Sequence, residues 1–112
     1  MKKLHIALGV ADIEASVLDY TQRFNQEPDV VIPGAYALWR TACLNVSIRA
    51  TDESEVGRLR HLGWESSDAA GFSNDTDCNG IVWELFSAEH QAKEIREIWP
   101  DADYDVSTRD ET

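Results

Sequence analysis

The chain has 112 residues, 43% of them hydrophobic and 28% charged, which suits one folded domain and excludes a disordered chain. Its formal net charge is −11 at pH 7, and its lysines and arginines form no cluster. Nucleic acid and anionic membrane surfaces are therefore excluded as expected partners, because both attract clustered positive charge. No segment has the length and apolarity of a signal peptide or a membrane span, so we expect a cytoplasmic protein with reduced cysteines.

The N-terminal segment predicts a strand followed by a helix. Residues 4–10 form a short apolar run whose side chains alternate between two faces, which places His5 opposite the face of Leu4. Asp12 is a favourable N-cap, and apolar residues follow it at helical spacing. This apolar stripe consists of Ile13, Val17, Tyr20 and Phe24. We expect the helix to cover the apolar face of the strand.

The middle of the chain predicts a hairpin. Pro33-Gly34 is a turn signal, and two strand candidates follow it, residues 35–40 and 42–49. They are separated by so few residues that an antiparallel connection is expected. Residues 51–55 are polar and indicate a loop.

The remainder of the chain predicts two strands and a helix. Residues 59–65 are compatible with a strand, although residues 55–62 could also form a helix, and residues 66–79 indicate a loop with a short strand near Gly71-Phe72. Asn79-Gly80 is a strong turn signal before a strand over residues 81–86. Ser87 then caps a second helix, which Pro100 ends. We expect one domain over residues 1–100 and an acidic, flexible tail over residues 101–112.

Three residues in the strand candidates could carry chemistry: His5, His61 and Glu84. Apolar neighbours flank His5 and Glu84 on both sides and His61 on one side, where Leu62 follows it, so all three would face the side of the sheet away from the helix. Two imidazoles and a carboxylate are the ligands of a facial triad, which holds a divalent metal and leaves positions open for substrate. The alternative at this point is that each is an ordinary packed or solvated side chain, because the sequence has no HExxH, CxxC, phosphate-binding or nucleophile-elbow motif.

Three segments together resemble the vicinal oxygen chelate superfamily of glyoxalases, bleomycin-resistance proteins and dioxygenases. Residues 4–16 resemble its first strand and helix, residues 60–65 the opening strand of its second module, and residues 79–86 the closing strand. Residues 33–37 and 44–48 are most similar to the branch of cadmium-induced proteins and carbon–arsenic lyases. The resemblance implies an α+β fold built from βαβββ modules, with a mixed curved sheet, one packed helix and a C-terminal helix.

By this resemblance, His5, His61 and Glu84 fall on the metal-ligand positions of the superfamily. The implied cofactor is a divalent ion of iron, manganese, nickel, cobalt or zinc. The fourth ligand position of glyoxalase I falls near Asn45 or Ser47, neither of which is a glutamate, so an open triad is favoured. The residues expected to contact a small-molecule substrate are Tyr36, Asn45, Ser47 and Arg49, with Tyr36 and Arg49 suited to orienting an anion.

The chain departs from the superfamily pattern in two ways. Too few residues separate Glu65 from Asn79 for the helix of a second module, and the adjacent cysteine pair of the arsenic-handling relatives is absent. The expected activity is that of a metal-dependent lyase, isomerase or dioxygenase-like enzyme. The alternatives are a metal-free binding protein that sequesters a small ligand, as drug-resistance members do, and a degenerate structural member. The shortened module also predicts a homodimer, with Trp83, Trp99 and Ile95 as candidate contacts.

Overall fold

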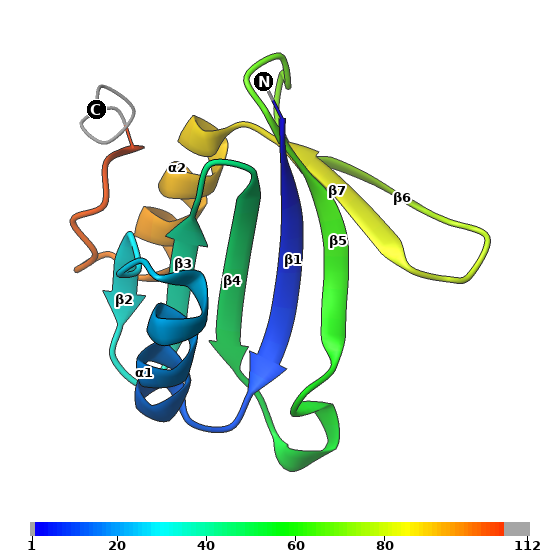
Figure 1. The fold of residues 1–112 in the computed structure, drawn as a ribbon. Helices are drawn as coiled ribbons and strands as arrows, with labels where there is room; N and C mark the ends of the chain where they lie inside the picture. The colour runs from blue at the N-terminus through cyan, green and yellow to red at the C-terminus, as the bar shows by residue number, and fades with distance from the viewer. Residues whose placement is uncertain (1, 107–112) are drawn as a thin grey trace.

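The computed structural model describes residues 2–106, which form one mixed seven-stranded sheet with two α-helices (Figure 1). The strands are β1 (Lys2–Val10), β2 (Val30–Ile32), β3 (Tyr36–Arg40), β4 (Leu44–Ala50), β5 (Leu59–Ser66), β6 (Ser73–Thr76) and β7 (Val82–Phe86). The helices are α1 (Ile13–Phe24), α2 (Ala88–Ile98) and a 3₁₀ turn (Glu53–Glu55). Neither α-helix among the described residues is long and apolar enough to cross a membrane.

Both helices begin at the caps that the sequence predicts. The Asp12 side chain accepts a hydrogen bond from the backbone N–H of Ala15 at 3.0 Å, and the Ser87 hydroxyl accepts one from the backbone N–H of His90 at 3.2 Å. Helix α1 ends where Asn25 adopts a left-handed conformation with φ of 54°. The predicted starts of both helices are therefore confirmed, and α2 ends at Ile98, just before Pro100.

The strand order across the sheet is β2-β3-β4-β1-β5-β7-β6. Strand β1 lies near the centre, parallel to β4 on one side and antiparallel to β5 on the other. The predicted hairpin is confirmed as the antiparallel pair β3–β4, and β5 is a strand instead of the alternative helix over residues 55–62. Two details differ from expectation: β2 was not predicted, and the short strand expected near Gly71-Phe72 lies at residues 73–76.

The two helices cover opposite faces of one half of the sheet. Strand β3 is buried on both sides, because Ala37 and Trp39 pack in the cluster beneath α1 while Tyr36 and Leu38 pack in the cluster beneath α2. In Figure 1, α1 lies in front of β3 and α2 behind it. The fold is thus a small α+β sandwich of helix, sheet and helix at its β2–β4 end.

The opposite end of the sheet lacks a helix on the α1 side. Cross-strand pairing brings apolar residues of β1, β5 and β7 together on this side, where they form what we call the uncovered apolar face. Its members are Leu4, Ile6, Leu62, Trp64, Trp83 and Leu85. Helix α1 packs only against the far end of β1, where Leu8 and Val10 join its cluster. The helix expected to cover the first strand therefore covers only part of it.

The segment after α2 folds back onto the core. Tyr104 and Val106 are only 3% and 2% exposed and pack with Ile95 of α2. The expectation of a flexible tail from residue 101 is therefore wrong for residues 101–106, because the side chains of Tyr104 and Val106 find buried positions. Residues 107–112 of the expected tail lie outside the described residues.

Candidate metal centre

Strand register brings His5, His61 and Glu84 to one face of the sheet. His5 of β1 lies opposite Gly63 of β5, and Gly63 lies beside Glu84 of β7. His61 is two residues from Gly63 on the same strand, so its side chain points to the same side. This is the face away from α1, as the sequence predicts.

The three side chains converge on one point. Nε2 of His5 lies 3.0 Å from Nε2 of His61, and Nε2 of His61 lies 2.9 Å from Oε1 of Glu84. All three candidate ligand atoms lie within 4.8 Å of one another. Ligands at about 2.1 Å from a metal and at right angles to each other are separated by about 3.0 Å, so the two short distances fit adjacent positions around one ion. The cluster is close enough to bind a metal ion.

The second nitrogen of His5 is fixed by Asn45. Nδ1 of His5 lies 2.9 Å from the side-chain oxygen of Asn45 and 3.1 Å from its backbone oxygen. Both partners are acceptors, so Nδ1 must carry the proton and donate it. The lone pair of Nε2 is therefore directed into the cluster, which is the arrangement that metal-binding histidines adopt.

A buried polar network holds Asn45 in turn. Its amide nitrogen donates to Glu65 and to Gln91 of α2, each at 2.8 Å. Glu65 also accepts two hydrogen bonds from Arg40, at 2.8 and 2.9 Å. Burial acts to raise the pKa of Glu65, but the hydrogen bonds from Arg40 and Asn45 outweigh it and hold the pKa below its ordinary value. An ionised, paired carboxylate thus anchors the support of His5.

The protonation states of two cluster members suit metal binding. Burial lowers the pKa of His5 below its ordinary value, which favours the neutral imidazole. The hydrogen bond with His61 lowers the pKa of Glu84, which favours the carboxylate. Metal ligands must be neutral histidines and ionised carboxylates, so the environment selects the forms that bind.

The cluster opens into a cavity of about 250 Å³ between the sheet and α2. Three of the four expected substrate residues line it: Tyr36, Ser47 and Arg49. Tyr36 and Ser47 are buried, and burial raises the pKa of Tyr36 far above the ordinary value of a phenol although the Ser47 side chain opposes this. Asn45 does not line the cavity, because its side chain is fully buried beneath His5. This cavity therefore does not support the expectation that Asn45 contacts substrate, which stays a prediction.

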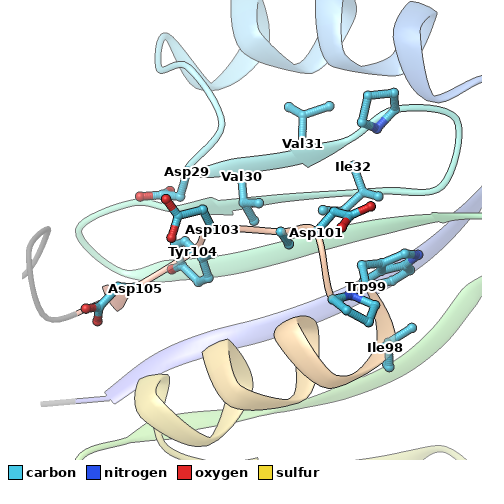
Figure 2. A pocket seen from close by; sticks show the side chains of 13 residues that line it. Asp29, Val30, Val31, Ile32, Ile98, Trp99, Asp101, Asp103, Tyr104 and Asp105 are labelled. Carbon is cyan, nitrogen blue, oxygen red and sulfur yellow. The ribbon is translucent and has the colours of Figure 1, made fainter.

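A larger cavity of about 790 Å³ lies elsewhere, between β2 and the segment that follows α2 (Figure 2). Its wall includes Val30 and Ile32 of β2 and Trp99 at the end of α2, and aspartates surround it. None of the three clustered ligand residues borders it. We therefore place the candidate site at the smaller cavity, where the titratable groups converge.

Sequence reasoning missed most of the supporting residues. Glu65 lies four residues after His61 on the same strand, so its side chain points to the same face of the sheet. The alternation that indicates the ligands therefore also indicates Glu65. Gln91 comes from a helix that begins after the last strand, and no spacing signal connects it with Asn45. Phe72 and Glu94 also line the cavity from a loop and from α2, and they carried no sequence signal.

Comparison with known proteins gives fold likeness alone. No family model and no curated protein matches the chain. A solved structure titled as an NAD-dependent benzaldehyde dehydrogenase from Legionella pneumophila has a TM-score of 0.53 at 11% identity, covering 75% of this chain and 97% of that chain. A hypothetical protein from Staphylococcus aureus has a TM-score of 0.55 at 9% identity, covering 77% of this chain, which spans only 33% of that protein. At such identities these structures share an arrangement of strands and helices with this chain, and their activities do not transfer to it.

Proposed function

We propose that this chain is a metal-dependent enzyme of the vicinal oxygen chelate superfamily, acting on a small molecule as a lyase, isomerase or dioxygenase-like catalyst. The observation that carries the proposal is the convergence of His5, His61 and Glu84 at 3.0 and 2.9 Å. The order β1-α1-β2-β3-β4, with β4 beside β1, supports one βαβββ module. The second half contributes β5, β6 and β7 without a helix between β5 and β6, in keeping with a shortened module.

The residues present fit a divalent metal in donor type and in protonation. His5 and His61 would supply nitrogen and Glu84 oxygen, a set that suits iron, manganese, nickel, cobalt or zinc without choosing among them. A bound ion supplies Lewis acidity that polarises a substrate oxygen. Asn45, which lies beneath the cavity, orients His5. The residues that line the cavity outside the cluster hold the substrate against it.

Metal affinity of the untagged protein tests the proposal. Stripped of metal and titrated with Zn²⁺ or Ni²⁺ in a calorimeter, the protein should bind one equivalent. The variant His61→Ala should lose at least about a hundredfold in affinity, because His61 is the member that contacts both of the others. Glu84→Gln should lose nearly as much, since it removes the only negative ligand.

The matched control is His90→Ala. His90 is the remaining histidine, and its ring is bonded to Ser87 at 2.6 Å, outside the cluster. This variant should bind metal as the unmodified protein does. Equal metal affinity in His61→Ala and His90→Ala would reject the metal centre.

A metal-free binding protein is the second candidate, and the aromatic lining of the cavity favours it. Phe72 stacks on Phe86 with ring centroids 5.4 Å apart, and Trp99 lies in the same wall. Such a wall would hold a small planar ligand without an ion. Ligand-induced change in tryptophan fluorescence that persists in excess chelator, in a protein that binds no metal, would favour this function.

We also propose that the protein is a homodimer. The uncovered apolar face supports this, because Trp64 and Leu85 on it are 38% and 37% exposed. Of the contacts expected from the sequence, Trp83 belongs to this face, whereas Ile95 is 2% exposed within the core beneath α2. Trp99 packs against Tyr36 with ring centroids 4.9 Å apart. The burial of Ile95 therefore does not support it as a contact, and Trp99 lies away from the uncovered face.

A further inference from the structure

Arg49 stands out among the residues that line the metal-site cavity. Its side chain is half-buried, and its guanidinium lies over the ring of Trp99 at 5.1 Å from the centroid. Within residues 2–106 it makes no hydrogen bond or ion pair, although a guanidinium carries five N–H donors. Stacking fixes the plane of the group and leaves its edge available, which is the geometry that receives a carboxylate with two parallel hydrogen bonds.

With a divalent ion bound, the cavity would be locally positive in an acidic protein. The formal net charge of the chain is −11, yet a divalent ion held by two neutral imidazoles and one carboxylate retains positive charge at one end of the cavity. Arg49 adds a second positive charge, and Arg60 lies at the exposed rim. Glu94 is the other carboxylate in the wall; it forms no ion pair with Arg49, and burial raises its pKa although the charge of Arg49 opposes this. With the ion in place, this charge distribution would favour an anion.

The positions of the metal cluster and Arg49 suit a ligand with two separate anionic ends. Through Ala7, Ser47 of β4 lies level with His61 of β5. Arg49 is two residues beyond Ser47, which is about 7 Å farther along the strand. One functional group of such a ligand would meet the metal and another would meet Arg49. A volume of about 250 Å³ restricts the ligand to a few carbon atoms between them.

We propose that the cavity binds a small dicarboxylate, with one carboxylate on the metal and the other on Arg49. This inference rests on the proposed metal function and deepens it by naming the substrate class. Arg49 acts as a binding residue that selects for the distal charge and for the length of the acid.

Binding of short diacids and their monomethyl esters tests this assignment. Oxalate, malonate, succinate and glutarate, each paired with its ester, are titrated into protein already loaded with one equivalent of Zn²⁺. The ester keeps the metal-binding carboxylate but removes the distal charge. For at least one length, the diacid should bind about tenfold or more tighter than its ester, as expected for a charge-assisted pair.

The variant Arg49→Gln should reduce this ratio to below about threefold while keeping its zinc affinity, which also shows that the variant folds. Arg58→Gln is the charge-matched control, because Arg58 is exposed and does not line the cavity, and it should keep the full ratio.

The outcomes separate this inference from the metal centre. Failure of the unmodified protein to take up zinc rejects the proposed function before any acid is added. Normal zinc binding with a diacid-to-ester ratio below about threefold at every length, or with a ratio that Arg49→Gln leaves unchanged, overturns the dicarboxylate assignment and leaves the metal centre standing.

Discussion

At the scale of single residues, the candidate centre depends on Asn45 as much as on the ligands. Its side chain is fully buried and bonded to His5, Glu65 and Gln91. These partners come from three different elements, so Asn45 links the sheet and α2 beneath the cluster. Loss of its amide would leave buried groups without partners, which costs free energy, and would free the ring of His5 to rotate.

We predict that Asn45→Leu lowers zinc affinity by about 10- to 100-fold, the usual cost of removing a residue that orients a metal ligand. The free energy of unfolding should fall by about 1–3 kcal/mol, because Glu65 and Gln91 lose buried hydrogen bonds. Calorimetric titration and urea denaturation measure the two effects. Gln22→Leu, which removes an exposed amide on α1 far from the cluster, is the control and should change neither. Unaltered zinc affinity in Asn45→Leu would show that His5 is oriented by other contacts.

The buried imidazole of His5 also predicts a pH dependence of stability. Burial holds its pKa in the folded protein below the value of 6.5 that applies to the unfolded chain. Between those two pKa values the unfolded chain binds a proton that the folded protein does not. The resulting stability is present above about pH 6.5 and is lost as pH falls toward the folded pKa.

We therefore predict that the metal-free protein loses stability from about pH 7 to about pH 5, and that His5→Gln has a flatter profile over this range. Urea denaturation in excess chelator at a series of pH values measures both. His90→Gln removes an imidazole outside the cluster and should keep the slope of the unmodified protein. A slope retained in His5→Gln would assign the proton to another group.

At the scale of secondary-structure elements, the sequence predicts well where an element carries its own pattern. Helix α1 has a cap and an apolar stripe, and β4 alternates, so both were predicted within about two residues. Strand β2 was missed because three residues between Pro28 and Pro33 are too few for any period. Strand β6 is polar and exposed along its whole length, and only its pairing with β7 makes it a strand.

In the candidate site, too, the residues within a strand pattern could be predicted and those that depend on long-range contacts could not. His5, His61 and Glu84 could be predicted because each sits in a strand whose alternation fixes its face. The role of Asn45 could not, because it depends on Gln91, 46 residues away on another element. The buried position of Tyr104 was missed because the acidic residues around it suggest a solvated segment. Contacts between residues far apart in the sequence therefore determine the positions that the local sequence pattern does not predict.

The backbones of β5 and β7 approach each other closely at Gly63, so a side chain added there should disturb the pair. A Cβ atom added at Gly63 would lie 2.4 Å from the backbone oxygen of Glu84, so one of the two strands must move. We predict that Gly63→Ala costs about 1–3 kcal/mol in the free energy of unfolding and lowers zinc affinity, because the movement displaces a ligand. Gly71→Ala meets no atom within 4 Å and should be neutral in both measurements. A neutral Gly63→Ala would mean that β7 shifts without disturbing the cluster.

At the scale of the whole molecule, the helices are distributed unevenly. Both lie at the β2–β4 end, so only that end of the sheet is covered on two faces (Figure 1). The other end has the polar metal cluster on one face and the uncovered apolar face on the other. Trp64 and Trp83 are neighbours on that face, with ring centroids 6.4 Å apart. Aromatic residues gathered on an open sheet face are typical of an interface.

We predict that the protein sediments at micromolar concentration with twice its monomer mass of 12.6 kDa. The double variant Trp64→Lys with Leu85→Lys should sediment as a monomer, because two charges on each facing surface cannot be desolvated or paired in a symmetric contact. Leu18→Lys is the matched control, since Leu18 is 73% exposed on α1 and lies off the uncovered apolar face. It should leave the dimer intact. A monomeric unmodified protein, or a double variant that remains dimeric, would contradict this assembly, and the second result would move the interface to another surface.

The metal cluster lies on the opposite face of the same strands, so zinc affinity should be the same in the dimer and in the monomeric variant.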